Sequence, residues 1–234
     1  MKKELVVSKS NSLARATNVL TLVEGRVIEY CLSQIYFKEE VTPDRLFTVD
    51  VEAMADKFNM QRGQAYQELR KVFIGIRGKE IRFPKHTNDG TEVVTSWVTA
   101  VHYNDKLERL ELRFATDIIP YISGELITKN FTTYHLSEIT KFKSSYTLRI
   151  YNICKSYAHN KASFTYETTV PELRNFLGIP DEEYPAWGSL NVVIKKCIAE
   201  INKVTQLNIE LIEKKLARKV HFLYFRMTHK GTTK

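Results

Sequence analysis

The sequence predicts an α+β fold in which two tandem units repeat the same order of elements. The first observation is a repeated apolar pattern, Val51-x2-Met54-x3-Phe58-Asn59-Met60 and Val170-x2-Leu173-x3-Leu177-Gly178-Ile179, found at a constant offset. The second is that a helix and a strand precede each copy, and a longer helix and a hairpin follow it. The shared order indicates internal duplication. We therefore expect two domains, residues 1–130 and residues 131–234.

The helices and first strand of the first half are predicted from apolar spacing. Apolar residues recur three, four and seven positions apart in three segments, which is typical of helices with one buried face. These predicted helices are Ser10–Phe37, Asp50–Asn59 and Gly63–Ile76. The turn residues Thr42-Pro43-Asp44 come before a short predicted strand, Leu46–Val49.

A stretch of strands follows in the first half. The predicted strands are Glu80–Phe83, Glu92–Tyr103 and Arg109–Phe114. The dipeptide Asp89-Gly90 predicts a hairpin turn between the first two, and Asn104-Asp105-Lys106 predicts a turn between the last two. A helix at Asp117–Leu126 is expected to close this half, with Asp117 as its N-cap and Pro120 in its first turn.

The second half repeats the plan. Helical spacing predicts Ser144–Tyr157, Val170–Leu177 and Ser189–Lys203, and a strand is predicted at Ser163–Tyr166. Gly178-Ile179 marks a kink after the second of these helices. Two strands, Leu207–Ile212 and Lys219–Met227, are expected to form a hairpin around residues 213–218.

This order of elements is that of a winged helix-turn-helix. A short helix, a tight turn with Asn or Gly, a longer helix and a β-hairpin follow one another in each half. The longer helix of such a unit fits the DNA major groove, which is about 12 Å wide, and the hairpin contacts the backbone or minor groove. The alternative is a winged helix that serves only as a protein-interaction module.

Charge favours DNA binding by the second half. The net charge is +8. Residues 131–234 hold 16 Lys and Arg against 9 Asp and Glu, whereas residues 1–130 hold 19 against 18. A basic field attracts polyanions, either nucleic acid or an acidic membrane surface. We expect double-stranded DNA as the partner, and no membrane.

The expected DNA-binding residues of the second half lie on its long helix and its hairpin. Asn can read adenine in the major groove, and Lys can reach guanine or phosphate. Ser189 is the expected N-cap, which would leave N–H groups facing a phosphate. The exposed positions of the helix are Ser189, Asn191, Val192, Lys195, Lys196 and Lys203, and the cations of the wing are Lys214, Lys215, Arg218 and Lys219.

Two further groups are candidates for DNA contact. Lys143, Ser144 and Tyr146 stand at the start of a predicted helix, where they would contact phosphate unless they only cap a core helix. In the first half the predicted helix exposes Arg62, Gln64, Gln67 and Lys71. Because this half is nearly neutral, dimerisation competes as its role, with the β-ribbon at residues 80–114 as a pairing surface.

Enzyme signatures are absent from the sequence. The phosphate-loop pattern G-x4-G-K-[ST] does not occur, and the six histidines form no pair at metal-binding spacing. We therefore expect no enzymatic activity, no cofactor and no metal. Cys31, Cys154 and Cys197 are expected to be buried free thiols in a cytoplasmic protein. The N-terminus lacks the apolar core of a signal peptide, and no apolar run is long enough to span a bilayer.

Several stretches resemble the iteron-binding Rep superfamily of plasmid replication initiators. The matching stretches run in register over almost the whole chain: residues 7–13 and 20–26, Ala65-Tyr66-Gln67-Glu68-Leu69, Ile119-Pro120-Tyr121-Ile122, Phe131-Thr132-Thr133-Tyr134-His135-Leu136, Lys143–Tyr151 and Glu200–Thr205. The resemblance implies two winged helices. The C-terminal one would bind repeated origin sites, and the N-terminal one would dimerise and add secondary DNA contacts.

The resemblance also implies partners. Monomers in equilibrium with homodimers would bind direct repeats at an origin and recruit host proteins such as the helicase and the initiator, while dimers would bind an operator and repress the protein's own promoter. The alternative is a transcriptional repressor without an initiation role. Two departures from the family stand out. The long helix begins with Leu190-Asn191-Val192-Val193 in place of a basic cluster, and the wing has Ala217 where the family has Gly.

Overall fold

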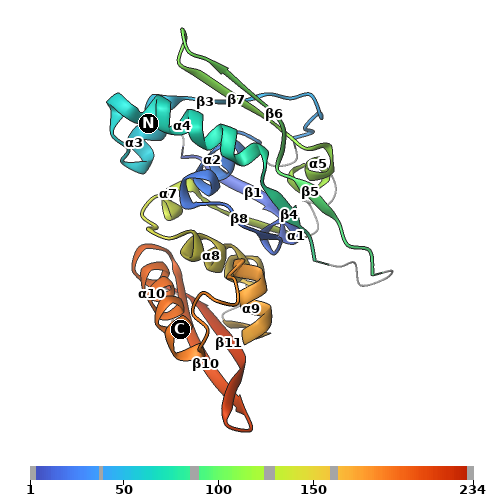
Figure 1. The fold of residues 1–234 in the computed structure, drawn as a ribbon, viewed down its shortest axis with the longest axis vertical. Helices are drawn as coiled ribbons and strands as arrows, with labels where there is room; N and C mark the ends of the chain where they lie inside the picture. The colour runs from blue at the N-terminus through green and yellow to red at the C-terminus, as the bar shows by residue number, and fades with distance from the viewer. Residues whose placement is uncertain (1–3, 37–38, 85–89, 124–129, 159–162, 231–234) are drawn as a thin grey trace. The chain divides into compact units, whose positions relative to one another are not determined.

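The computed structural model describes residues 4–36, 39–84, 90–123, 130–158 and 163–230. The chain forms two compact units, Met1–Lys141 and Phe142–Lys234, whose elements are labelled in Figure 1. A boundary after residue 130 was expected, and the structure places it eleven residues later. The reason is that β8 (Phe131–His135) pairs antiparallel with β1 (Val6–Ser10), from Val6 opposite His135 to Ser10 opposite Phe131. This pairing holds the segment after residue 130 in the first unit.

The N-terminal segment differs from its prediction. The single helix expected at Ser10–Phe37 is wrong, because the chain there forms β1, α1 (Asn11–Ala14), β2 (Thr17–Asn18) and α2 (Leu22–Leu32). A capping box begins α2: the Thr21 hydroxyl accepts from the Glu24 N–H, and the Glu24 carboxylate accepts from the Thr21 N–H. The apolar residues before and after this cap keep helical spacing, so a prediction from spacing alone treated the two segments as one helix.

A buried ion pair fastens β1 to α2. Lys9 Nζ lies 2.5 Å from Glu29 Oε1, and both side chains are at most 5% exposed. The ammonium group also lies 5.5 Å from the ring centroid of Tyr134 on β8. Burial lowers the pKa of Lys9, although the charge of Glu29 and its hydrogen bond act in the opposite direction. The β1–β8 pair is therefore anchored to the helical core of its own unit.

The first unit contains the expected winged helix. Its elements are β3 (Phe47–Val49), α3 (Val51–Phe58), α4 (Arg62–Arg77), β6 (Val98–Asn104) and β7 (Arg109–Phe114), with strand order β3-β7-β6. The Asp50 carboxylate accepts from the Ala53 N–H at the start of α3, and Asn59 ends the helix in the left-handed conformation at φ 53°.

An inserted sheet separates α4 from the hairpin. The strand expected at Glu92–Tyr103 breaks at Trp97 into β5 (Val94–Ser96) and β6, which belong to different sheets. Strand β5 pairs with β4 (Glu80–Arg82), which also pairs with β2, and the predicted turn at Asp89 lies outside the described residues.

The helix that closes the strands of the first unit starts later than predicted. A 3-10 turn (Thr116–Ile118) leads into α5 (Ile119–Ile122). The prediction of Asp117 as N-cap is therefore wrong, because Asp117 lies inside the 3-10 turn. Pro120 lies in the first turn of α5, as predicted. Residues 124–126 of this predicted helix lie outside the described residues. After β8, the short helix α7 (Leu136–Ile139) completes the unit.

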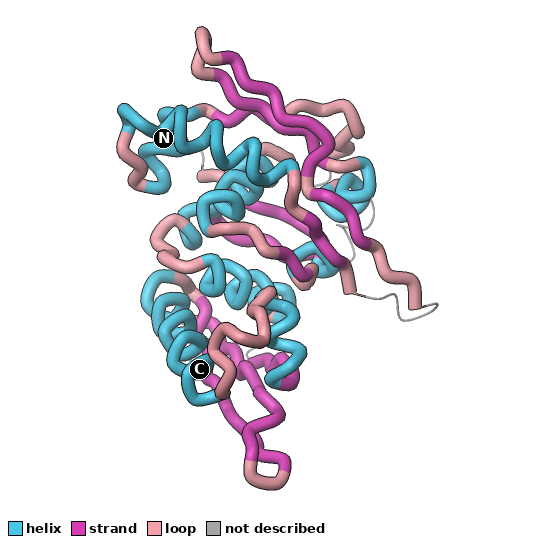
Figure 2. Tube along the Cα trace, viewed as in Figure 1, coloured by secondary structure: helices cyan, strands magenta, loops and turns pink. Residues whose placement is uncertain are grey.

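The second unit matches its predicted elements closely. They are α8 (Ser145–Tyr157), β9 (Ser163–Thr169), α9 (Val170–Leu177), α10 (Trp187–Val204), β10 (Leu207–Leu216) and β11 (Lys219–His229). The Ser144 hydroxyl accepts from the Tyr146 N–H and caps α8, which was the alternative to the predicted phosphate contact, and Gly178 ends α9 at φ 58°. The strands take the order β10-β11-β9, and helices α8, α9 and α10 lie beside this sheet (Figure 2).

The two units share one topology. In each, the strand before the short helix pairs with the second strand of the hairpin, β3 with β7 and β9 with β11. The buried positions of the longer helices also correspond at one constant offset, and these pairs are Ala65 and Leu190, Leu69 and Ile194, Phe73 and Ile198, and Ile76 and Ile201. The predicted duplication therefore extends to the core of each unit.

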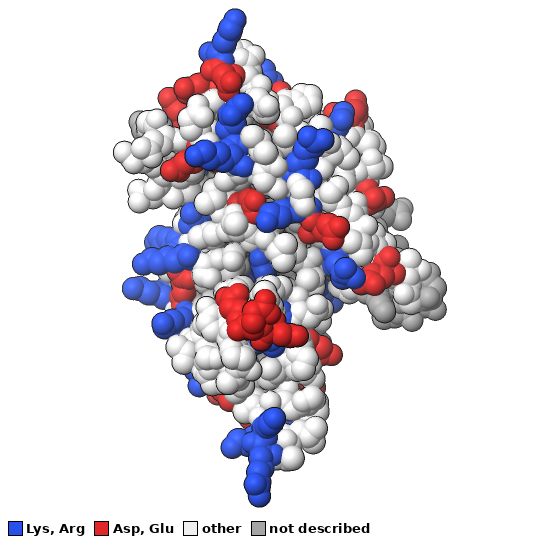
Figure 3. Space-filling model, viewed as in Figure 1, with Lys and Arg blue, Asp and Glu red and all other residues white. Residues whose placement is uncertain are grey.

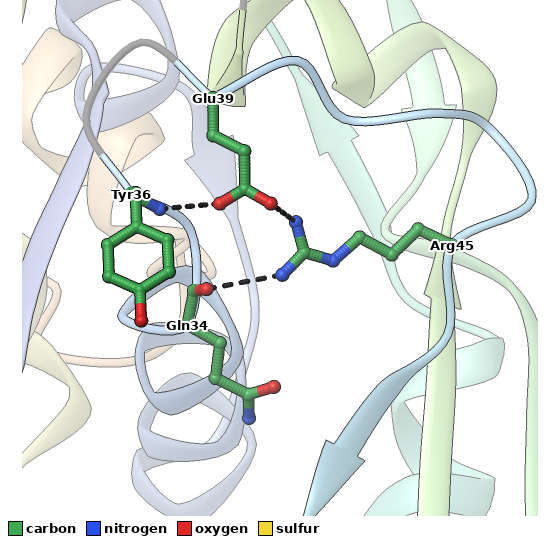
Figure 4. Close-up of polar contacts among 4 residues, drawn as sticks. All are labelled: Gln34, Tyr36, Glu39 and Arg45. Carbon is green, nitrogen blue, oxygen red and sulfur yellow. Dashed lines mark hydrogen bonds and ion pairs between the residues drawn. The ribbon is translucent and has the colours of Figure 1, made fainter.

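A polar clasp closes the loop between α2 and β3. The Arg45 guanidinium donates to Glu39 Oε1 over 2.5 Å and to the Gln34 carbonyl over 3.2 Å, and the Tyr36 N–H donates to Glu39 Oε2 over 2.7 Å (Figure 4).

The three cysteines, Cys31, Cys154 and Cys197, are buried free thiols, as predicted.

Candidate nucleic-acid interface

Helix α10 begins earlier than predicted. Ala186 is its N-cap and makes no side-chain capping hydrogen bond, so the prediction of Ser189 as N-cap is wrong. Ser189 instead lies within the first turn, exposed, with its hydroxyl donating to the Ala186 carbonyl over 2.8 Å. The serine occupies that turn because the apolar register of the helix extends back to the partly buried Trp187.

The outer face of α10 is mainly polar and basic, with Val192 and Ala199 as exposed apolar side chains. Ser189, Lys195, Lys196 and Lys203 are exposed. Val192 stands among them with 53% of its surface exposed. Leu190, Ile194 and Ile201 on the opposite face are fully buried. The helix therefore presents one continuous exposed face, and Figure 3 shows Lys and Arg along the edge of the unit that carries α10.

The Glu213 carboxylate links α10 to the wing. Glu213 on β10 accepts from Trp187 Nε1 through Oε2 at 3.0 Å and from Asn191 Nδ2 through Oε1 at 2.9 Å. Lys195 Nζ lies 3.5 Å from the same Oε1. The sequence interpretation missed Trp187 and Glu213, although an acid flanked by wing lysines was a signal that could have found the second.

Asn191 occupies a different position from the one expected of a base reader. Its amide nitrogen is held by Glu213, and its Oδ1 is buried without a hydrogen-bond partner among the described residues. The amide thus lies against the wing strand, while Val192 and Lys196 lie on the exposed face of the helix.

The wing carries four cations at its tip. Lys214, Lys215, Arg218 and Lys219 are all exposed, and the β10–β11 register shifts between Lys214 and Lys215. Ala217 takes the left-handed conformation at φ 55°, at a cost of roughly 1–2 kcal/mol for a residue with a Cβ. Figure 3 shows the tip as a group of basic side chains.

The start of α8 offers less to a phosphate than predicted. Glu200 accepts from the Lys143 N–H over 2.9 Å and from the Thr147 hydroxyl over 2.7 Å. The Tyr146 hydroxyl donates to Glu183 over 3.3 Å, and burial followed by the charge of Glu183 raises the pKa of Tyr146. Ser144 caps the helix. Of the three predicted residues, Lys143 is the one with an exposed side chain.

In the first unit, α4 exposes a mixed face. Gln64, Gln67 and Lys71 are exposed as predicted, next to the exposed Glu68. Arg62 begins the helix, but its side chain lies outside the described part of the structure.

Two other side chains of α4 contact the hairpin of the first unit. The Tyr66 hydroxyl donates to Asp105 Oδ1 over 2.7 Å, and Arg70 Nε lies 3.4 Å from the same oxygen. Burial, followed by this hydrogen bond, raises the pKa of Tyr66 to about 12.

Within the described residues, no group of His, Cys, Asp and Glu could hold a metal ion, and no helix is long and apolar enough to cross a membrane.

Two family models match the chain. Residues 6–155 match the model described as Initiator Replication protein, WH1, and residues 169–227 match the one described as Initiator Rep protein, WH2. The chain belongs to the initiator replication protein family. The predicted fold, two tandem winged-helix domains, is thereby confirmed, as is the predicted family. The first family model extends into α8, whereas the compact units divide at Lys141.

Members and neighbours of this initiator family are similar over most of the chain. A replication initiation protein of Escherichia coli is 26% identical over 96% of this chain and 70% of its own length. An uncharacterized 27.6 kDa protein of Escherichia coli is 28% identical over 88% of this chain and 89% of its own length. The crystal structure of Pi initiator protein in complex with iteron DNA shares the fold, with a TM-score of 0.80, 24% identity and coverage of 99% of this chain and 100% of that one.

Proposed function

We propose that this initiator binds direct repeats of double-stranded DNA at a plasmid origin and starts replication there. The observation that carries the proposal is the second unit's combination of an exposed, basic α10 face with a wing tip of four cations. The solved relative of the same fold was crystallised with iteron DNA. In such a complex the helix in the major groove recognises the base sequence, and the cations of the wing contact phosphates and so set the position of the protein on the duplex.

Each group of residues has a proposed role. Ser189, Val192 and Lys196 enter the major groove, and Lys195, which pairs with Glu213, lies at the edge of this surface next to the wing. The wing residues Lys214, Lys215, Arg218 and Lys219 contact phosphates, as do Lys203 and Lys143. Arg62, Gln64, Gln67 and Lys71 on α4 add secondary DNA contacts.

The first unit is proposed to dimerise first and to bind DNA second. Its half of the sequence is nearly neutral, so fewer phosphates would be drawn to it. Monomers in equilibrium with homodimers bind the origin and recruit the host helicase and initiator, and dimers bind an operator and repress the protein's own promoter. The protein works in the cytoplasm, uses no cofactor and catalyses no reaction.

The test of DNA binding uses the full chain and duplexes from the DNA that flanks its coding sequence. Fluorescence anisotropy is measured on a duplex with direct repeats and on a scrambled duplex, at low and at physiological salt. The expected result is preference for the repeats and a steep linear fall of log affinity with log salt, as counterions are released. A flat salt response on both duplexes would favour an interaction module instead.

A second experiment separates initiation from repression alone. A plasmid with the flanking DNA but without the gene is introduced into cells that supply the protein in trans. Replication of that plasmid supports initiation, whereas repression of a promoter fusion without replication supports a plain repressor. Supercoiled plasmid incubated with the protein should stay uncut, and cleavage would contradict the absence of enzymatic activity.

A further inference from the structure

The Glu213 carboxylate on the wing strand β10 contacts three side chains of α10. We propose that Glu213 is a positioning residue that fixes the wing against the helix and offsets the charge of Lys195, so that it sets selectivity between DNA sequences. The inference rests on the proposed DNA binding. It concerns a negatively charged residue inside a basic surface, which phosphate attraction alone would disfavour.

The contacts of Glu213 engage both of its oxygens. Oε1 accepts from Asn191 and faces the Lys195 ammonium group, and Oε2 accepts from the Trp187 indole. Those three residues follow one another at intervals of four along α10, so they lie on one side of the helix. Glu213 is 25% exposed. An acid can read cytosine by accepting from its amino group, but here both carboxylate oxygens already have partners within the protein.

This arrangement divides α10 into two sides. Asn191 lies on the side that contacts the wing, because its amide nitrogen donates to Glu213 and its oxygen is buried. Ser189, Val192 and Lys196 lie on the exposed side. We therefore assign Asn191 to wing attachment, and base contact to the exposed side.

The first unit builds the same link from different chemistry. Tyr66 follows the buried Ala65 as Asn191 follows Leu190, and Arg70 follows Leu69 as Lys195 follows Ile194. Both Tyr66 and Arg70 contact Asp105 on the hairpin, at 2.7 and 3.4 Å.

Equivalent helix positions therefore meet a hairpin carboxylate in both units. A coincidental surface ion pair does not account for this recurrence, because such pairs have no reason to occupy equivalent positions. The recurrence indicates that the link belongs to the scaffold.

Selectivity follows from competition for Lys195. A scrambled duplex offers mainly phosphates, and Lys195 gains little there because it must leave a carboxylate to contact one. A cognate duplex gains from a wing and a helix that are already held in their joint geometry, which reduces the ordering cost of binding. Removal of the Glu213 charge should thus strengthen binding to any DNA while it weakens discrimination.

The experiment compares Glu213→Gln with Glu210→Gln in the full chain. Gln keeps the size of Glu and removes the charge. Glu210 lies on the same strand, pairs with Arg226 over 3.3 Å and makes no hydrogen bond or ion pair with α10 among the described residues. Binding to repeat and scrambled duplexes is measured across salt concentrations, and thermal unfolding checks the fold.

For Glu213→Gln we expect roughly three- to tenfold tighter binding to the scrambled duplex. The plot of log affinity against log salt should become steeper by about 0.9, the value for one additional neutralised phosphate. The ratio of affinities for the repeat and the scrambled duplex should fall about tenfold. Glu210→Gln should keep the ratio. Equal effects of the two variants would overturn the proposal.

A charge cycle tests the link to Lys195 itself. In a Lys195→Gln background, Glu213→Gln should no longer steepen the salt slope. Persistence of the effect would show that Glu213 acts by general repulsion and would overturn the proposal.

If Glu213→Gln lowers the melting temperature, the exposed single variants Lys195→Gln and Lys196→Gln decide. On scrambled DNA, Lys196→Gln should reduce the salt slope by about 0.9 and Lys195→Gln should reduce it much less, and equal reductions would contradict the inference. Absence of salt-dependent binding by the unmodified protein would instead sink the proposed function itself.

Discussion

Helices α4 and α10 have the same buried register but different exposed faces. At equivalent positions α4 carries Gln64, Gln67 and Lys71 where α10 carries Ser189, Val192 and Lys196. The two hairpins differ in charge more than the two helices do. The tip of the first holds Asp105, Lys106, Glu108 and Arg109, which balance in charge, whereas the tip of the second holds the four cations Lys214, Lys215, Arg218 and Lys219.

Buried and exposed positions of a duplicated unit are thus under separate constraints. The buried positions must fill a core, so both units keep apolar residues there. Exposed positions carry little of the stability and can change with function. The charge contrast between the hairpins is therefore the observation that best supports the proposed division of roles between the units.

The largest expected effect concerns a part that the first unit has and the second lacks, the β1–β8 pair. Lys9→Met leaves the Glu29 charge buried without its partner, which costs about 3–5 kcal/mol. Hydrogen exchange followed by mass spectrometry should show loss of protection in α2 and β8, with α10 unchanged. The double variant Lys9→Met/Glu29→Leu should recover most of the stability, and a double variant as unstable as Lys9→Met would show that the pair itself is not the cause.

The next effect tests the contrast between the hairpins. Replacing Lys214, Lys215, Arg218 and Lys219 together by Gln should lower affinity for the repeat duplex on the order of a hundredfold and flatten the salt slope by about 0.9 for each phosphate that is no longer neutralised. The matched control, Lys106→Gln with Arg109→Gln in the first hairpin, should change both quantities little. Similar decreases from both sets would mean that the two hairpins bind DNA equally, and the proposed division of roles would fail.

A smaller effect tests the exposed face of α10. An exposed Val beside lysines is suited to contact the methyl group of thymine. Replacing thymine by uracil at one position of the repeat should weaken binding by about 1 kcal/mol, the value of one buried methyl group. Val192→Ala should abolish this sensitivity, and Gln67→Ala at the equivalent position of α4 should retain it. A uracil scan with the same profile for both variants would remove Val192 from the interface.

The sequence predicted those parts of the fold that depend on local signals. Helices α3, α8 and α9 have caps within their own segments, Asp50, Ser144 and Gly178 among them, and their predicted bounds agree with the structure within a residue or two. Strand β1 was missed because its partner β8 lies in the far part of the chain, and only that pairing makes residues 6–10 a strand. Local spacing carries no information on such a pairing.

The candidate site was predicted in part for the same reason. The exposure of Val192, Lys195 and Lys196 follows from helical periodicity, which the sequence contains. The position of Asn191 depends on Glu213, which lies on a strand that reaches α10 only in the folded unit. Periodicity placed Asn191 beside the apolar stripe and could not show what covers it.

The smallest expected effects test the equivalence of the units at one backbone position. Asn59 and Gly178 both end their short helix in the left-handed conformation, at φ 53° and 58°. Asn tolerates this conformation, and Gly relieves it but loses more entropy on folding, so the two nearly balance. Asn59→Gly and Gly178→Asn should each change the free energy of unfolding by less than about 0.5 kcal/mol. Asn59→Ala and Gly178→Ala should each cost about 1 kcal/mol, because Ala has neither advantage. Denaturant unfolding of the four variants measures this, and a destabilisation at one position without a matching one at the other would show that the two turns, although alike in conformation, are not held alike by their units.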